Sequence, residues 1–359
     1  MKYVNEYRNG AVAQSLTDKI NEISRKPIRL MEICGTHTMA IFRHGIRSLL
    51  PDSIELVSGP GCPVCVTAVE DVDRAVKLSK IPGVVLTTFG DMLRVPGTAS
   101  SLQAEKAKGA DIRMVYSTVD ALKIARENPD KDVVFLGIGF ETTAPTIAAA
   151  IMAASETGQQ NFSVVSSHKL LPPAMAALLS GGNLAVDGFI CPGHVTTIIG
   201  TSAYERVAEE YEIPCVVIGF EPVDILQGLL MLVKQIEEGR SDVEIQYVRG
   251  ASAEGNPGAV KVMGKVFEPC DSKWRGLGMI PGSGLSIRTE YSTYDAGKKF
   301  DIDVPPAKEP PGCLCGDVLR GVARPPDCKL FRKVCSPRAP VGPCMVSSEG
   351  TCAAYYKYS

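Results

Sequence analysis

The sequence has no marked excess of charge of either sign. Its 359 residues include 38 Lys and Arg against 40 Asp and Glu, which gives a formal net charge of −2, and no long run of one sign occurs. Proteins that bind nucleic acids or anionic membranes usually concentrate basic residues in a patch or tail. The composition therefore predicts neither nucleic acid nor a membrane as a partner.

Long apolar segments are also missing. The opening residues, MKYVNEYRNGAVAQ, contain no apolar stretch of the kind that secretory signal peptides carry. The longest weakly polar run, APTIAAAIMAA, is too short to cross a bilayer, because a spanning helix needs about 20 residues. We therefore expect a soluble protein located in the cytoplasm.

Two common ligand-binding motifs are absent as well. The sequence has neither a GxGxxG dinucleotide fingerprint nor a P-loop, so a zinc-stabilised nucleotide-binding module is the weakest of the functions considered. Only one CxxC motif occurs, Cys62-Pro63-Val64-Cys65. A closed zinc site built from two such motifs is therefore disfavoured.

Cysteine, in contrast, is abundant. In a reducing compartment structural disulfides are rare, and thiols more often bind metals or take part in redox chemistry. Of the 12 cysteines, six lie in the last 47 residues: Cys313, Cys315, Cys328, Cys335, Cys344 and Cys352. The C-terminal segment is therefore predicted to be a thiol-rich unit.

Apolar runs that end near Gly or Pro alternate with helical patterns from residue 28 onward. Examples are IRLMEIC, GVVLTTFG, VVFLGIGF and CVVIGF. This alternation is typical of α/β folds with parallel sheets. LMEICGTHTMA also resembles FLGIGFETTAPT about a hundred residues later, and two further pairs of segments align at a similar offset. We therefore predict two related parallel-sheet α/β domains, residues 28–125 and 130–238, that face a cleft.

Two further segments flank these domains. Apolar residues fall roughly on one helical face over residues 1–27, up to Pro27, which predicts a helical lead-in. Beyond residue 240 short apolar runs, proline clusters and the six cysteines follow one another. This pattern predicts a smaller, irregular domain over residues 240–359, whose small core would need a metal to stabilise it.

The first candidate site lies at the expected carboxyl edge of the first domain. Cys34 ends one apolar run, and Cys62 and Cys65 follow the next run. Adjacent parallel strands bring such positions to one edge, where open α/β folds bind their ligands. We therefore expect these thiols to meet there and to serve redox or transient soft-metal chemistry, with a buried structural role as the alternative. For His37, at the start of the following helix, a structural and a functional role both remain open.

The second domain carries candidates at what should be the matching strand ends. Glu141 lies in GFETTAP and His194 in CPGHVTT, and we predict acid–base or supporting roles for both. Cys191, Cys215 and Cys270 lie in or beside apolar runs. These three are interpreted as core or boundary thiols.

The six C-terminal thiols form the second candidate site. Sets of four thiolates hold iron–sulfur clusters, and a structural zinc bound by the same thiols is the alternative. Six thiols are two more than a cluster needs, so one member of the Cys313-Leu314-Cys315 pair can bind it while the other pairs with Cys344. We assign to a 4Fe-4S cluster Cys313, Cys328, Cys335 and Cys352, and to an adjacent redox dithiol Cys315 and Cys344.

Long motifs across nearly the whole chain resemble the HypD family of NiFe hydrogenase maturation proteins. They are MEICGTHTMAIFRHGIRSLLP, SGPGCPVCVT, GFETTAP, CPGHVTTIIG, WRGLGMIPGSGL and CKLFRKVCSPRAPVGPCMVSSEGTCAAYYKY. The resemblance implies a complex with the small protein HypC that carries an iron with cyanide and carbonyl ligands. It further implies that HypE, with HypF upstream, supplies the cyanide, and that the hydrogenase large subunit receives the product.

The resemblance also implies roles for single residues. Cys34 is then the iron-site or cyanide-relay thiol, and Cys62 and Cys65 are a neighbouring pair that binds iron or supplies electrons. The family's cluster surroundings resemble those of ferredoxin:thioredoxin reductase, which suggests electron flow through Cys315 and Cys344 towards that pair. Two functions follow as hypotheses: a scaffold for assembling the Fe(CN)2CO group, or a free-standing 4Fe-4S disulfide oxidoreductase.

Overall fold

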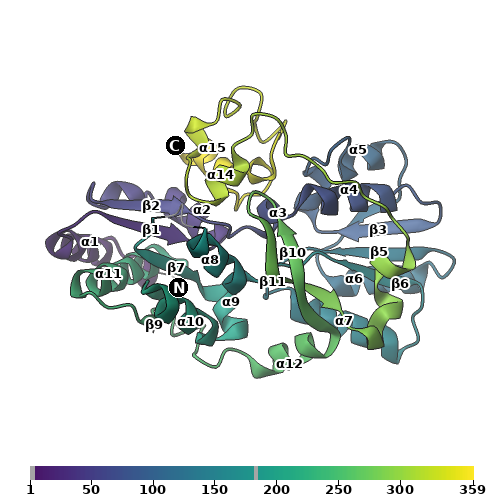
Figure 1. The fold of residues 1–359 in the computed structure, drawn as a ribbon, viewed down its shortest axis with the longest axis horizontal. Coiled ribbons are helices and arrows are strands. Elements are labelled where there is room, and N and C mark those ends of the chain that lie inside the picture. The colour runs from purple at the N-terminus through teal and green to yellow at the C-terminus, as the bar shows by residue number, and fades with distance from the viewer. Residues whose placement is uncertain (1–4, 182–184) are drawn as a thin grey trace.

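The computed structural model describes residues 5–181 and 185–359. Residues 1–4 of the expected lead-in and 182–184 of the expected second domain lie outside the described residues. Two parallel sheets and one antiparallel hairpin form the framework, and the C-terminal segment lies over the region between the two sheets (Figure 1). No helix in the described part is both long and apolar enough to cross a membrane.

The first sheet has five parallel strands in the order β2-β1-β7-β8-β9. Their bounds are β1 (Ile28–Glu32), β2 (Ile54–Ser58), β7 (Gly188–Pro192), β8 (Cys215–Ile218) and β9 (Val243–Ile245). Helices cover both faces, because Ile190 of β7 belongs to one apolar core and its neighbours Phe189 and Cys191 to another. The helices are α1 (Gly10–Ile23), α2 (Gly35–Arg43) and α11 (Pro222–Glu238) on one face, and α8 (Leu171–Ser180) and α10 (Ser202–Tyr211) on the other.

The second sheet has four parallel strands in the order β4-β3-β5-β6. Their bounds are β3 (Val84–Thr88), β4 (Ile112–Met114), β5 (Asp132–Gly137) and β6 (Phe162–Ser166). Its faces are covered by α6 (Thr118–Glu127) and α7 (Ala144–Glu156) on one side, and by α4 (Val69–Leu78) and α5 (Leu102–Ala107) on the other. Strands buried on both faces are largely apolar, as in VVLTT of β3 and DVVFLG of β5, which is why they read as nearly continuous apolar runs. The predicted α/β class with parallel sheets is confirmed.

The predicted division into consecutive domains 28–125 and 130–238 is wrong in its assignment of strands. The chain makes β1 and β2 of the first sheet, crosses to make all of β3 to β6, and returns for β7 to β9. β1 therefore pairs with β7, more than 150 residues later in the sequence. The similarity at a fixed offset reflects the pattern of strand, turn and helix that parallel α/β units share, and that pattern does not specify which strands pair.

The predicted third domain over residues 240–359 is likewise not one unit. β9 completes the first sheet. The hairpin of β10 (Phe267–Trp274) and β11 (Gly278–Ile287), preceded by α12 (Pro257–Val266) and followed by α13 (Ala296–Lys299), packs against the second sheet through Phe267 and Leu285. The thiol-rich segment begins only after residues 301–310, a stretch without regular secondary structure in which the backbone N–H of Ala307 donates to Glu70 of α4.

Short helices complete the described chain. The thiol-rich segment contains α14 (Cys315–Leu319) and α15 (Thr351–Tyr358), and α3 (Pro63–Val66) follows β2 while α9 (Gly193–Ile199) follows β7. The 3-10 helices are η1 (Glu6–Arg8), η2 (Ile46–Leu49), η3 (Gly90–Arg94), η4 (Thr289–Tyr294), η5 (Pro325–Asp327) and η6 (Pro343–Met345).

Candidate functional site

One buried apolar cluster joins the ends of both sheets to the hairpin and the thiol-rich segment. Its members come from parts of the chain far apart in sequence and include Cys62, Cys65, Phe140, Cys191, Trp274, Cys315 and Cys344. Four of the candidate thiols, Cys62, Cys65, Cys315 and Cys344, therefore belong to a shared core.

Cys34 lies in the turn between β1 and α2 and is half-buried. The turn that follows β2 lies directly against it, because a Cβ added to Gly61 would lie 2.3 Å from the backbone nitrogen of Cys34. Only glycine allows so close an approach of two backbones. The N–H of Gly35 donates to the Gly61 carbonyl at 2.9 Å. The two turns therefore adjoin, as expected for neighbouring parallel strands.

A buried carboxylate fixes α2 relative to the sheet. Glu32, at the end of β1, accepts hydrogen bonds from Thr38 Oγ1 at 2.7 Å, Ser58 Oγ at 3.0 Å and Arg47 Nη2 at 2.7 Å. Three donors, one of them charged, satisfy a carboxylate that is removed from water. The network holds the start of α2, and with it Cys34, against the carboxyl end of β1.

Glu349 of the thiol-rich segment reaches this turn, a contact that the sequence analysis did not predict. Thr36 Oγ1 donates to Glu349 Oε1 at 2.6 Å, and a Cβ on Gly35 would lie 2.6 Å from the Glu349 carbonyl oxygen. Burial raises the pKa of Cys34 to about 11, and the negative charge of Glu349 contributes to that rise. The acidic residue beside Cys352 was the available signal, but nothing local predicts a contact across 313 residues.

His37 and His194 both stack on the ring of Phe220, which follows β8. The ring centroids of His37 and His194 lie 4.6 and 4.0 Å from that of Phe220. His37 Nε2 lies 3.0 Å from the carbonyl oxygens of Ile218 and Gly219, so we assign the proton to Nε2, from which it is donated. Burial lowers the pKa of His37 to about 4, so the ring is neutral at pH 7 and joins α2 to β8.

His194 differs from His37 in being exposed to solvent. Partial burial lowers its pKa, while the charge of Glu349 acts in the opposite direction. Glu349 thus acts on both Cys34 and His194. His194 is therefore the imidazole that solvent can reach at this edge.

Glu141 is placed differently from the sequence prediction. It follows β5 of the second sheet, whereas His194 follows β7 of the first, so the two are not matching ends of one domain. Its Oε1 accepts a 2.8 Å hydrogen bond from the N–H of Leu171, and its buried Oε2 has no hydrogen-bond partner among the described residues. Burial raises the pKa of Glu141 to about 7.

Cys62 and Cys65 form a buried thiol pair around α3. Cys62 is the N-cap residue and Pro63 occupies the first helical position, where proline is favoured. The Sγ atoms of Cys62 and Cys65 lie 2.6 Å apart, and the Cys65 N–H donates to Cys62 Sγ at 3.3 Å. Burial raises the pKa of Cys65.

All six C-terminal thiols line one cavity. They are Cys313, Cys315, Cys328, Cys335, Cys344 and Cys352, and the remaining wall is largely apolar, with Val318, Leu330, Phe331 and Met345. Cys315 Sγ and Cys344 Sγ lie 2.6 Å apart. A shell of thiols in apolar surroundings is the donor set that iron–sulfur clusters use, so these residues fit such a group.

The two groups of thiols meet at Cys65. Cys65 and Cys344 are close enough for their side chains to interact, and Cys65 Sγ lies 4.0 Å from the carbonyl of Pro343. Cys315, Cys344, Cys65 and Cys62 therefore form a continuous run from the cavity to the turn beside Cys34. Among residues 5–181 and 185–359, no three His, Cys, Asp or Glu side chains converge as a closed site for one metal ion.

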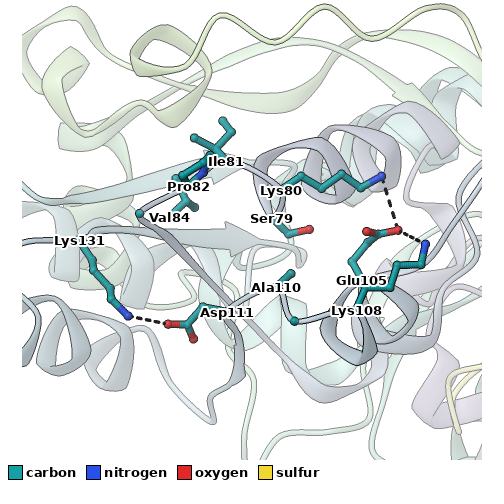
Figure 2. A pocket seen from close by; sticks show the side chains of 12 residues that line it. Ser79, Lys80, Ile81, Pro82, Val84, Glu105, Lys108, Ala110, Asp111 and Lys131 are labelled. Carbon is teal, nitrogen blue, oxygen red and sulfur yellow. Dashed lines mark hydrogen bonds and ion pairs between the residues drawn. The ribbon is translucent and has the colours of Figure 1, made fainter.

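A polar pocket of about 390 Å³ lies at the other edge of the second sheet, near the starts of β3, β4 and β5 (Figure 2). Lys80 and Lys108 contact Glu105 at 3.5 and 3.0 Å, and Lys131 contacts Asp111 at 3.1 Å. The acidic side chains that line it are thus paired with its lysines. The thiols all lie away from this pocket.

Comparisons with known proteins give the same family over nearly the whole chain. A family model named HypD, with the description "Hydrogenase formation hypA family", matches residues 11–359. The hydrogenase maturation factor HypD of Rhizobium leguminosarum is 48% identical over 368 residues, which cover 100% of this chain and 96% of the relative. HypD of Azotobacter vinelandii is 49% identical over 367 residues, with coverage of 100% and 97%. A putative hydrogenase expression/formation protein of Methanocaldococcus jannaschii is 45% identical over 350 residues, or 97% of each chain.

Proposed function

The chain belongs to the HypD family of hydrogenase maturation factors, and we propose that it is a cytoplasmic scaffold for assembling the Fe(CN)2CO group of NiFe hydrogenases. The iron with its cyanide and carbonyl ligands is then the substrate. HypC would hold it together with this chain, HypE would supply cyanide with HypF upstream, and the hydrogenase large subunit would receive the product.

The run of thiols that ends beside Cys34 supports this proposal. Iron that carries cyanide and carbon monoxide needs soft, electron-rich ligands and shielding from water. Cys34 offers a half-buried thiol at the carboxyl edge of the first sheet, next to the buried Cys62 and Cys65 pair. HypC bound over the exposed face of His194 would cover this edge.

Metal binding at Cys34 requires loss of its proton. Because the pKa of Cys34 is raised to about 11, the thiol is protonated at neutral pH, and the bound iron must displace that proton. Glu349 lies near Cys34, and His194 lies near Glu349, so the proton can pass to Glu349 and from there to the neutral ring of His194. We assign them that role.

The C-terminal cavity would hold the resident cofactor. Cys313, Cys328, Cys335 and Cys352 would ligate a 4Fe-4S cluster, which leaves Cys315 and Cys344 as a pair. A cluster of this kind supplies single electrons when bound. The apolar residues of the wall would keep water from its sulfur atoms.

A disulfide can be exchanged between two pairs of thiols, Cys62 with Cys65 and Cys315 with Cys344. The Cys344 thiolate attacks Cys65 in a Cys62–Cys65 disulfide and releases Cys62, which takes a proton. The Cys315 thiolate then attacks Cys344 and releases Cys65, which also takes a proton. Two electrons and two protons thereby move to Cys62 and Cys65, and the disulfide moves to Cys315 and Cys344.

Metal analysis tests the cofactor. We expect about four irons and about four sulfides per chain after anaerobic purification of the wild type, and loss of both in Cys328→Ser. Stoichiometric zinc without sulfide would contradict the proposed cluster.

Infrared spectroscopy tests the scaffold. Complexes co-purified with HypC should show the stretching bands of iron-bound cyanide and carbonyl for the wild type and for the Cys270→Ser control. Cys34→Ser should lack them. Bands that persist in Cys34→Ser would rule out Cys34 as the iron ligand.

The same thiol run favours one competing function, a free-standing disulfide oxidoreductase. A turnover assay separates the two functions. Repeated reduction of a protein disulfide in the absence of HypC and HypE would support the oxidoreductase, while a stoichiometric complex without turnover would support the scaffold.

A further inference from the structure

Arg275 is a buried cation between the two groups of thiols. It lies at the tip of the hairpin, directly after β10, and its side chain is 0% exposed. Burying a guanidinium is costly unless its charge and its donors are used. The groups that Arg275 contacts therefore indicate the role of its charge.

Two donors of Arg275 hold the segment that follows Cys65. The backbone N–H donates to the Val66 carbonyl at 2.9 Å, and Nε donates to the Thr67 carbonyl at 2.9 Å. Both carbonyls lie within two residues of Cys65. These bonds fix the end of α3 against the hairpin tip, and neutral donors could make them equally well.

The charge of Arg275 is only partly balanced. Nη1 lies 3.3 Å from Glu309 Oε2, but the Glu309 side chain is 45% exposed, so water weakens this ion pair. Nη2 is buried and has no hydrogen-bond partner among the described residues. A positive charge and a free donor thus remain inside the protein.

The thiol-rich segment lies against this loop. A Cβ on Gly276 would be 2.3 Å from Gly316 Cα, so the backbone after Arg275 contacts the backbone after Cys315. Nη1 of Arg275 pairs with Glu309, and the N–H of Cys313 donates to the carbonyl of Pro310, the residue after Glu309, at 3.1 Å. The guanidinium is therefore close to the cavity wall.

We propose that Arg275 sets the reduction potential of the cluster bound in the C-terminal cavity by stabilising its reduced, more negative state. This inference rests on the proposed cluster. Adding an electron to a cluster with four thiolates adds negative charge in surroundings of low polarity, where a nearby cation lowers the energy of the reduced form more than that of the oxidised form. Arg275 is thus a positioning and charge-compensating residue, and removing its charge makes the cluster harder to reduce.

A redox titration followed by electron paramagnetic resonance tests the inference on the anaerobically reconstituted full chain. Arg275→Gln keeps donors but loses the charge, and its midpoint potential should become more negative. Arg275→Lys keeps the charge and should stay closer to the wild type. Glu309→Gln removes the partial counter-charge and should shift the potential in the positive direction.

Several results would overturn the inference. One is a midpoint potential in Arg275→Gln that equals that of the wild type. Another is a midpoint potential in Glu309→Gln that is unchanged or more negative. If Arg275→Gln fails to hold a cluster, Glu309→Gln still decides the question, because it leaves Arg275 in place. Iron and sulfide content distinguishes the failures: a wild type without both refutes the cluster and this inference together, whereas intact clusters with unmoved potentials refute only the role of Arg275.

Discussion

The hydroxyl group of Thr36 donates a 2.6 Å hydrogen bond to the carboxylate of Glu349. This bond joins α2, near the start of the chain, to the thiol-rich segment near its end, and it lies beside Cys34. The negative charge that Glu349 places beside Cys34 therefore depends on how the C-terminal segment packs against α2.

Replacing Glu349 by Gln should make Cys34 more reactive. The charge of Glu349 adds to the rise of the Cys34 pKa to about 11, so its removal lowers that pKa and increases the thiolate fraction at pH 8. We expect alkylation of Cys34 by iodoacetamide to accelerate roughly twofold to tenfold, because one pKa unit is a factor of about ten in thiolate. Mass spectrometry of the Cys34 peptide measures the rate.

The exposed neighbour Ser348 supplies the matched control for this measurement. Ser348→Ala changes the same segment without changing its charge, and it should react at the wild-type rate. An unchanged or slower rate in Glu349→Gln would show that Glu349 does not control Cys34.

Gly35→Ala should destabilise the fold. The added Cβ would lie 2.6 Å from both Cβ and the carbonyl oxygen of Glu349, so the thiol-rich segment must shift away from α2. Crowding of this kind typically costs about 1–3 kcal/mol. The midpoint of urea unfolding should fall, whereas that of Gly10→Ala, where nothing lies within 4 Å of the added Cβ, should not. Equal midpoints for the two variants would contradict the contact.

Glu141→Gln should change how stability depends on pH. Burial raises the pKa of Glu141 to about 7, above the value of about 4.3 for an unfolded chain, so the folded state binds the proton more tightly. The free energy of unfolding of the wild type therefore falls as the pH rises from about 4.3 to about 7. Above pH 7 the loss is on the order of 3 kcal/mol. The uncharged Gln carries no such penalty.

Urea unfolding at pH 5, 6, 7 and 8 measures this effect. The stability of Glu141→Gln relative to the wild type should increase with pH across the series. The exposed Glu156 of α7 provides the control, since Glu156→Gln should follow the wild type at each pH. Parallel curves for Glu141→Gln and the wild type would refute the shifted pKa.

Cys344→Ser should interrupt disulfide exchange between the two thiol pairs. Cys344 is the member of the C-terminal pair that interacts with Cys65. In reconstituted protein treated with dithionite, differential thiol labelling should find Cys62 and Cys65 reduced in the wild type and in Cys270→Ser, but oxidised in Cys344→Ser. Reduction at the wild-type rate in Cys344→Ser would exclude this route.

Much of the fold could be predicted from local patterns. Apolar runs such as GVVLTTFG and CVVIGF became the buried strands β3 and β8. The pairing of β1 with β7 could not be predicted. Hydrophobic periodicity reports the conformation and burial of a segment, but not which strand lies beside it.

The candidate site shows the same limit. The sequence pointed to Cys34, the Cys62 and Cys65 pair and the C-terminal thiols, because thiol chemistry depends on residue type. It did not point to Glu349 or to the buried charge of Arg275, because both act through contacts with distant segments. It also placed Glu141 and His194 on one sheet, whereas they follow strands of different sheets.

The sequence by itself therefore determined the α/β class, the positions of most strands and the concentration of thiols near the C-terminus. These properties follow from residue type and spacing within short windows. Only the tertiary structure decided which strands share a sheet, that Cys344 approaches Cys65, and that Glu349 lies beside Cys34. Each of these joins segments distant in sequence, and such contacts form when separate apolar faces are buried in common cores, which no short window of sequence encodes.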